Sequence, residues 1–264
     1  MRFYESGLWD APVLLLLPGT CCHWKKNFGP VLPMLNEHFH VVCASYDGFD
    51  ETESTLFTTV THQVEKIEAF VQKQFGGTIH AVYGCSLGGS LAGMLVERGN
   101  IRIAHAILGS SDLDQEEGLP ARFKAWLIGK VLHGIMQKGR LPRWMQKRLE
   151  QKPPEQKVYM EKMLAMMGLL DGSMAFVKRA SIQSQFHSDL ITPLGQGIHA
   201  EGTTVHCFYA KKMGEEYLRR YNQHFARPHI TICCTRSCCC AARSNGCRKC
   251  AVQRKPTGKV EKSA

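Results

Sequence analysis

The chain has 264 residues, of which 44% are hydrophobic, and it carries a formal net charge of +10. This length and composition predict one globular domain, with room for an inserted part, and exclude a disordered chain. The N-terminus has no signal-peptide pattern, and the longest apolar run, Val13 to Pro18, is too short to span a bilayer. We therefore expect a cytoplasmic protein with no membrane partner.

The positive charge is concentrated at the C-terminus. Residues 233–264 contain eight Lys or Arg and one acidic residue, so they account for +7 of the net charge of +10. Seven of the twelve cysteines also lie in this segment. The body before it is nearly neutral, and its five scattered cysteines suit a reducing compartment. Residues 233–264 are interpreted as a basic, cysteine-rich tail that is distinct from the body.

The first part of the chain alternates between apolar strands and helices. Residues 1–10 predict a short strand or hairpin, and 11–17 a buried parallel strand followed by a loop at 18–24. Further strands at 40–45, 78–83 and 101–108 alternate with helices beginning at 31–35 and covering 60–74 and 90–98. This alternation predicts an α/β fold whose mostly parallel, doubly wound sheet is covered on both faces.

The alternation stops after residue 112. Residues 113–199 are predicted to form an inserted helical cap, with helical stretches at 121–138, 144–151, 155–168 and 173–186. Seven of the eleven methionines lie in it, and they either line an apolar substrate cleft or pack the cap helices together. Its many lysines and arginines are interpreted as a solvated face. The core is predicted to comprise residues 1–112 and 200–232, with a strand at 203–209, a helix to about 225 and a last strand at 229–232.

One stretch predicts chemistry. In Tyr83-Gly84-Cys85-Ser86-Leu87-Gly88-Gly89, the serine stands between a predicted strand and a predicted helix. A sharp strand–turn–helix unit pushes a serine Oγ out above the sheet edge, and it needs glycines where strand and helix approach most closely. The alternative is an ordinary glycine-rich turn, but the flanking strand and helix favour Ser86 as a nucleophile.

The order of a strand, a Pro-Gly-Thr loop, a G-x-S-x-G turn, a helical insertion and a late acid resembles the α/β-hydrolase superfamily over roughly residues 10–232. This resemblance implies that Ser86 is the nucleophile and that the backbone N–H groups of Leu87 and Thr20 form the oxyanion hole. The family more often has His-Gly where this chain has Pro18-Gly19. Because the donor is a backbone group, that difference leaves it in place.

The resemblance implies an acid that orients a catalytic histidine, and two carboxylates remain open for that role. Glu215 follows the strand after the cap, where the superfamily usually has its acid, and Asp112 ends the strand after the turn helix. Either carboxylate also fits an ordinary place at a helix N-terminus.

The catalytic histidine is expected after the last strand, yet no histidine follows His229. His224 falls in a predicted helix and His229 at the start of a strand, so neither lies on the required loop. The triad implied by the resemblance therefore lacks its base.

The genetic code offers an explanation for the missing base. When the reading frame is shifted by one base, each new codon takes the last base of one codon and the first two of the next. Two adjacent cysteine codons then give leucine, and the codons of Cys234 and Thr235 give only His or Tyr. The shifted frame therefore permits Leu-His-Glu-Glu-Leu-Leu-Leu, followed by an amphipathic helix. This resembles the catalytic histidine segment and closing helix of many bacterial α/β-hydrolases. Our hypothesis is a frameshift near Ile232 that replaced both with the basic tail.

The predicted function is a serine hydrolase that acts on a small carboxylic ester or related acyl compound through an acyl-enzyme, impaired in this chain by the missing base. No cofactor, metal or nucleic acid is expected at the site, and the substrate and oligomeric state stay open. One alternative is a catalytically inactive binding protein of the same fold. Another is a zinc-binding, nucleic-acid-binding tail built on Cys247-Arg248-Lys249-Cys250 and its neighbouring cysteines.

Overall fold

The computed structural model describes residues 1–111, 113, 119–210 and 214–233. Its strands are β1 (Arg2–Gly7), β2 (Val13–Leu17), β3 (His40–Ser45), β4 (Thr78–Cys85), β5 (Arg102–Gly109), β6 (Thr204–Ala210) and β7 (His229–Cys233). Its helices are α1 (Trp24–Phe28), α2 (Leu32–Leu35), α3 (Val60–Phe75), α4 (Leu87–Arg98), α5 (Leu119–Lys138), α6 (Arg143–Glu150), α7 (Pro154–Met166), α8 (Arg179–Ile191) and α9 (Glu215–His224).

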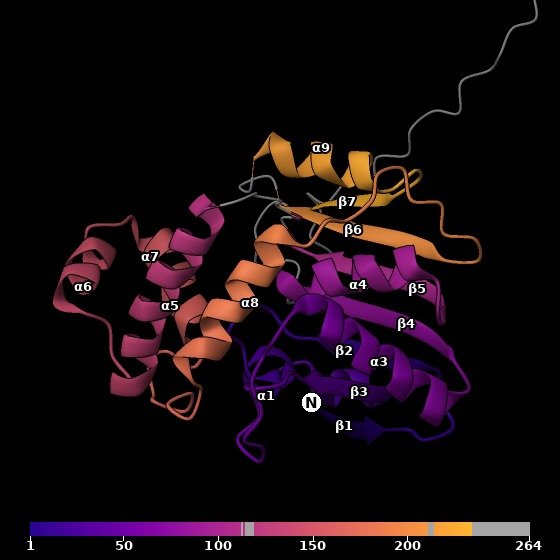
Figure 1. Cartoon of the computed structure of the whole chain (residues 1–264), viewed down its shortest axis with the longest axis horizontal. Coiled ribbons are helices and arrows are strands. Elements are labelled where there is room, and N and C mark those ends of the chain that lie inside the picture. The colour runs from indigo at the N-terminus through magenta and orange to yellow at the C-terminus, as the bar shows by residue number, and fades with distance from the viewer. Residues whose placement is uncertain (112, 114–118, 211–213, 234–264) are drawn as a thin grey trace, which may run out of the picture.

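The strands form one sheet in the order β1-β3-β2-β4-β5-β6-β7. β1 runs antiparallel to β3, and the other described pairs are parallel. Central strands are almost wholly apolar, as β3 and β2 show, because both of their faces are covered. The predicted mostly parallel α/β fold is confirmed, and residues 1–10 supply an antiparallel edge strand (Figure 1).

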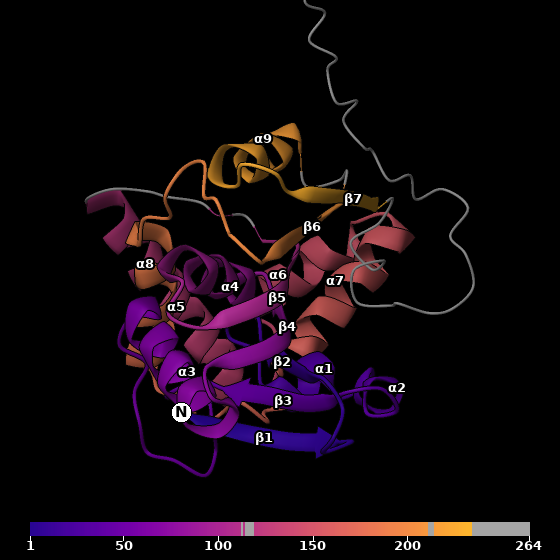
Figure 2. The same ribbon diagram turned by 90° about the vertical axis from the view of Figure 1, so that its right-hand side faces the viewer.

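Helices cover the two faces of the sheet unequally. Figure 2 shows α3, α4 and α9 on one face and α1 and α2 on the other. On the α1 side, Phe28 packs with Leu16 and Ala81 over β2, β3 and β4. Farther along that face the side chains on β5 and β6 stay partly exposed, whereas their neighbours on the opposite face are buried. The partly exposed strip comprises His105, Ile107, His206 and Phe208.

Helices α5 to α8 lie between β5 and β6 in the chain, and α5 to α7 stand to one side of the sheet with α8 nearest to it (Figure 1). The last of these helices begins at Arg179, later than the predicted start at 173. Turns replace the first part of the predicted helix. Asp171 Oδ1 accepts hydrogen bonds from the Ser173 N–H at 3.0 Å and Oγ at 2.6 Å, and the Val177 N–H donates to the Met174 carbonyl at 3.1 Å. Such a local turn competes with a helix.

Candidate active site

Ser86 occupies a strained backbone position between the end of β4 and the start of α4. Its φ of 52° and ψ of −115° place an ordinary L-residue in a region that costs about 1–3 kcal/mol. The Ser86 N–H donates to the Gly109 carbonyl of β5 at 2.8 Å, and its carbonyl accepts from the Gly89 N–H at 2.8 Å. The turn is therefore held from both sides, with Ser86 at its apex.

Three glycines make this turn possible. A Cβ on Gly84 would collide with the backbone of Gly88, and a Cβ on Gly88 would collide with the Leu17 carbonyl at the end of β2. The sequence predicted this requirement for Gly84 and Gly88. Gly89 has the same need, because a Cβ there would collide with the Ser111 hydroxyl beyond β5. That contact spans two elements, so spacing alone did not reveal it.

The loop after β2 lies against the Ser86 turn. A Cβ built on Gly19 would come within 3.3 Å of the Cys85 carbonyl oxygen and 3.6 Å of the Ser86 Cβ. Among the hydrogen bonds within the described residues, the N–H groups of Thr20 and Leu87 donate to no protein acceptor. The two predicted oxyanion donors therefore belong to segments that meet at Ser86, and both are available to a ligand oxygen.

Neighbouring groups hold the loop around Thr20 in place. The Gly19 N–H donates to Asn27 Oδ1 at 2.9 Å, and the Cys21 N–H donates to Gln185 Oε1 at 2.8 Å. The buried Tyr46 hydroxyl donates to the Pro18 carbonyl at 3.0 Å. Because the amides on both sides of Thr20 are occupied, its own N–H has one fixed direction.

A polar stripe on α8 makes one of these contacts, and sequence analysis missed it. Ser181, Gln185 and Ser188 are all buried and lie at helical spacing. Ser181 Oγ accepts from the Phe57 N–H at 3.2 Å, and Ser188 Oγ accepts from the Val60 N–H at 2.8 Å. The stripe thus fastens α8 to buried backbone N–H groups of the core. The signal in the sequence was three polar residues repeated at helical spacing.

Of the two candidate acids, Glu215 and Asp112, only Glu215 lies within the described residues. Glu215 is the first residue of α9 and is exposed, beyond the carboxyl end of β6. Burial raises the pKa of the nearby Tyr209 hydroxyl, and the negative charges of Glu215 and Glu216 raise it further. Asp112 lies outside the described residues. Glu215 is therefore at the sheet edge on which Ser86 stands, and the choice between the two acids stays a prediction.

Neither late histidine reaches the carboxyl edge of the sheet. His224 ends α9 and is buried, with its Nδ1 2.8 Å from the Gly195 carbonyl oxygen. His229 begins β7 at the amino edge, opposite His206. Both histidines lie where the sequence placed them, in a helix and at the start of a strand, and the missing base stays a prediction.

His23 lies on the loop after β2, but both of its ring nitrogens are engaged. Nδ1 accepts from the Lys25 N–H at 3.3 Å, and Nε2 lies 2.7 Å from Glu51 Oε2. With a hydrogen bond accepted at Nδ1, the ring carries its proton on Nε2. Burial would raise the pKa of the Glu51 carboxyl, but hydrogen bonds, one of them from His23, lower it. His23 therefore acts as the N-cap of α1, with no free nitrogen for Ser86.

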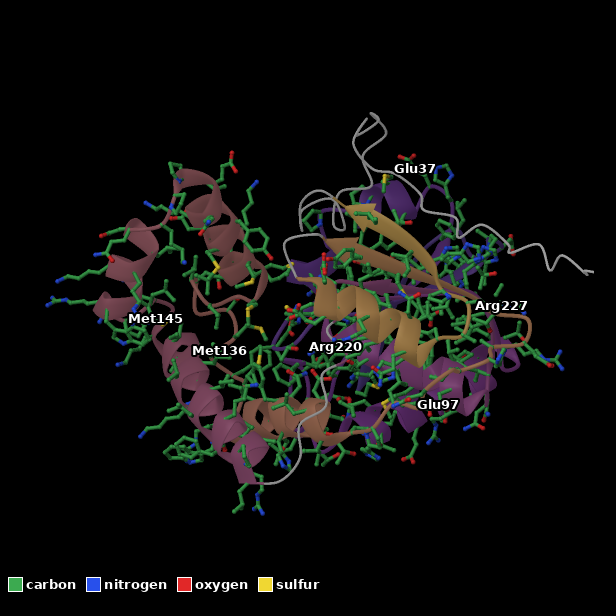
Figure 3. The ribbon with its side chains drawn as sticks, turned by 90° about the horizontal axis from the view of Figure 1, so that it is seen from above. Glu37, Glu97, Met136, Met145, Arg220 and Arg227 are labelled. Carbon is green, nitrogen blue, oxygen red and sulfur yellow. The ribbon has the colours of Figure 1, made fainter. Side chains whose placement is uncertain are left out.

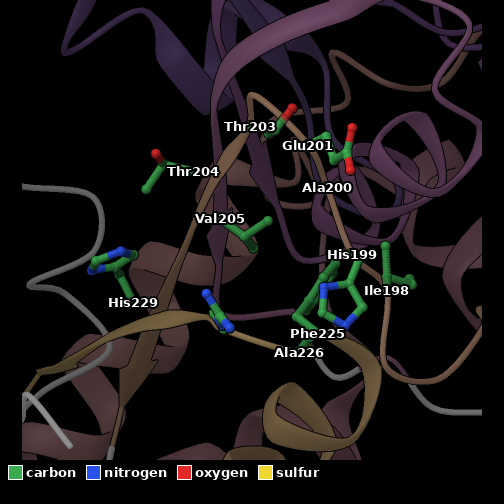
Figure 4. A pocket seen from close by; sticks show the side chains of 11 residues that line it. Ile198, His199, Ala200, Glu201, Thr203, Thr204, Val205, Phe225, Ala226 and His229 are labelled. Atoms are coloured by element: carbon green, nitrogen blue, oxygen red, sulfur yellow. The ribbon is translucent and has the colours of Figure 1, made fainter. Parts of the chain in front are cut away.

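A cavity of about 340 Å³ lies at the amino ends of β6 and β7, where Figure 4 shows His199, Glu201 and His229 around it. This is the edge opposite Ser86. Among the residues that the structure describes, no three His, Cys, Asp or Glu side chains are grouped to hold a metal. The predicted zinc alternative falls on the tail, outside the described residues. Within the same described ranges, no helix is long and apolar enough to cross a membrane.

Comparisons with known proteins agree with this fold. No curated protein matches the sequence. An α/β-hydrolase family protein from Desulfitobacterium hafniense has a TM-score of 0.69 at 14% identity, over 88% of this chain and 89% of that one. MenH from S. aureus has a TM-score of 0.63 at 14% identity, over 88% of each chain. A carboxylesterase from Nitrososphaera gargenis has a TM-score of 0.67 at 10% identity, over 88% of this chain and 85% of that one.

The family comparison covers the Ser86 turn and both segments that meet there. The model of the alpha/beta hydrolase fold matches residues 12–165, from the start of β2 through α4 and into the inserted helices. This match extends over more than half of the chain, and the solved structures named above share the overall fold. The chain therefore belongs to the α/β-hydrolase family.

Proposed function

We propose that this protein is a serine hydrolase whose nucleophile is Ser86 and whose substrate is a small carboxylic ester or a related acyl compound. The observation that carries the proposal is the strained backbone of Ser86, held between β4 and α4 by glycines that tolerate no side chain. Strain of this kind persists only where the surroundings enforce it, and it clusters at catalytic sites. An ordinary turn needs no such arrangement.

In the proposed mechanism, Ser86 Oγ attacks the carbonyl carbon of the ester while its proton passes to a base. The N–H groups of Leu87 and Thr20 then hold the negative oxygen of the tetrahedral intermediate. The base returns the proton to the departing alcohol, and an acyl-enzyme remains. Water, deprotonated by the same base, attacks the acyl carbon and releases the acid and Ser86. Helices α5 to α8 serve as the cap over this site.

The base is the missing part, and we propose that the frameshift near Ile232 removed it. β7 pairs in register with β6, so its end lies at the same carboxyl edge as Ser86. A histidine at position 235, as the shifted frame permits, would follow β7 by two residues. This is the place in the chain order Ser, acid, His that the chemistry requires.

The half-covered face of the sheet supports the same hypothesis. His105, Ile107, His206 and Phe208 are partly exposed on the α1 side of β5 and β6, and His206 and Phe208 lie beside β7, opposite His229 and Thr231. An amphipathic helix after β7 would bury Ile107 and Phe208, whereas the basic sequence of the tail offers little apolar surface for them. The shifted frame permits such a helix.

The alternative function is a binding protein with this fold and no turnover. A catalytic triad that lacks its base keeps only the residual catalysis of binding and the oxyanion hole. For the 264-residue chain as printed we therefore expect little turnover, even where the restored gene encodes an enzyme.

The first experiment is to read the source gene across codons 225–255. One base lost or gained near codon 232 supports the frameshift, and an intact printed frame in independent isolates removes it.

The second experiment labels the frame-restored protein with a fluorophosphonate, which reacts with activated serines. We expect labelling of the wild type, loss of labelling in Ser86→Ala, and full labelling in Ser90→Ala, one helical turn farther along α4. Labelling that survives in Ser86→Ala rules out the proposed nucleophile. A restored wild type that takes no label favours the binding protein.

A further inference from the structure

Positive charge is segregated onto the helices that stand away from the sheet. Residues 119–166, which span α5 to α7, contain eleven Lys or Arg and three Glu, a net charge of +8. The rest of residues 1–232 contains fourteen Lys or Arg and nineteen Asp or Glu, a net charge of −5. Figure 3 shows long side chains with nitrogen tips projecting outward from the helices near Met136 and Met145. The molecule therefore has one strongly basic end.

Large apolar side chains are exposed at the same end. Phe123 is 63% exposed, Trp126 47%, Leu127 46% and Trp144 53%. The rings of Phe123 and Trp126 stack at 6.0 Å between centroids, and Lys130 Nζ lies 5.4 Å from the Trp126 ring. Phe123, Trp126 and Lys130 thus form one continuous aromatic and cationic surface on α5.

A groove of about 610 Å³ joins α5 to α6 on this surface. Its apolar lining comes from Leu127, Val131, Ile135 and Leu141, with Trp144 at the α6 side. Four cations also line it, and none of them has an ion-pair partner among the described residues; they are Lys130, Lys138, Arg140 and Arg143. We call the four exposed apolar residues, the groove and these four cations the α5–α6 surface.

This combination selects one kind of partner. A second copy of the chain, packed symmetrically through the same helices, would bring a like-charged surface, which repels. A nucleic acid would pair with the cations but would offer no apolar phase for Phe123 and Leu127. A layer of anionic lipid offers both, because its phosphates lie at the level of the cations and its acyl chains lie just below. Trp side chains next to Lys and Arg are typical of the membrane interface.

We propose that the α5–α6 surface docks this protein onto anionic lipid membranes. Trp126 and Trp144 lie at the headgroup level, Phe123 and Leu127 reach the acyl boundary, and the four cations contact lipid phosphates. The docking is peripheral and needs no spanning helix. It revises two sequence-based expectations: that the protein has no membrane partner, which rested on the short apolar runs, and that the lysines and arginines of these helices form a solvated face. It is independent of Ser86.

The test is sedimentation of the full-length chain with vesicles made of equal parts of phosphatidylcholine and phosphatidylglycerol, compared with phosphatidylcholine alone. Each cation near an anionic surface is worth about fivefold in binding, so Lys130→Gln with Arg143→Gln should weaken it by about 30-fold. Trp126→Ser with Trp144→Ser should weaken it by at least roughly tenfold. All variants keep the basic tail, so its contribution is constant.

Matched controls remove the same groups elsewhere. Lys73→Gln with Arg219→Gln takes two exposed cations from α3 and α9, and Trp9→Ser takes a 69% exposed tryptophan from the β1–β2 turn. Binding that is lost in the α5–α6 variants and kept in the controls, with equal melting temperatures, supports the proposal. Equal binding by all variants, equal binding to both vesicle types, or no binding overturns it. The proposal is also overturned if the wild type binds no vesicles but self-associates, and this self-association is lost in the variant with Trp126→Ser and Trp144→Ser.

Discussion

The backbone N–H of Cys21 donates to the side chain of Gln185, 164 residues later in the chain, at 2.8 Å. Cys21 has a left-handed φ of 55° and follows Thr20, whose N–H is a proposed oxyanion donor. Gln185 belongs to α8, one of the inserted helices. The direction of the Thr20 N–H therefore depends on how α8 packs against the core.

Gln185→Met should destabilise the protein and loosen this loop. The side chain keeps its length, so little volume is lost, but the buried Cys21 N–H loses its acceptor, at a cost of about 1–3 kcal/mol in the free energy of unfolding. Urea unfolding measures this cost, with Ser184→Ala on the same helix as the control. A Gln185→Met variant as stable as the wild type would contradict the role assigned to this contact.

Gly88→Ala should abolish the Ser86 turn. The new methyl group would meet the Leu17 carbonyl, which is backbone and cannot move aside, so we expect loss of several kcal/mol or failure to fold. Gly134→Ala is the control. It lies inside α5, nothing stands within 4 Å of its added Cβ, and alanine there should stabilise the helix by about 0.5–1 kcal/mol. Thermal melts distinguish the two, and equal melts would show that the contact at Gly88 relaxes freely.

Asp47 should make stability depend on acid pH. Burial alone would raise the pKa of its carboxyl, but hydrogen bonds from Lys66, the α-amino group and Gln63 lower it to about 2. Because the folded pKa lies below the ordinary value of 3.8, the stabilisation is present above about pH 4 and is lost as the pH falls toward 2. The shift corresponds to about 2 kcal/mol.

In Asp47→Asn this part of the pH profile should flatten, as measured by urea unfolding between pH 2 and pH 6. The exposed carboxylate of Glu37 provides the control, and Glu37→Gln should leave the slope as in the wild type. A slope unchanged in Asp47→Asn would mean that other carboxylates cause the acid sensitivity.

The catalytic acid can be assigned in the frame-restored protein. Removing the carboxylate that orients the histidine should lower kcat by about 10⁴-fold. We expect this loss in Glu215→Gln, with Glu216→Gln, the adjacent residue of the same helix turn, near wild-type activity. If Asp112→Asn shows the large loss and Glu215→Gln does not, the acid follows β5 instead of β6.

Local chemistry explains how much of the site could be predicted from the sequence. The apolar run of β4, the glycines around Ser86 and the helix after it interact within a few residues of one another, so their spacing alone predicted the strand, turn and helix. The long-range partners were not predictable in this way. Gly89 against Ser111, and Gln185 against Cys21, meet only because β5 and α8 fold back onto the turn.

The sequence by itself determined the α/β class, the strained serine and the absence of a histidine after the last strand, because periodicity, glycine spacing and residue order are local or linear properties. Only the tertiary structure decided which amides hold the Thr20 loop, that both ring nitrogens of His23 are engaged, and that the charges of α5 to α7 gather beside exposed tryptophans. These are relations across space, and they arise when strands and helices distant in sequence pack together and fix the directions of their polar groups.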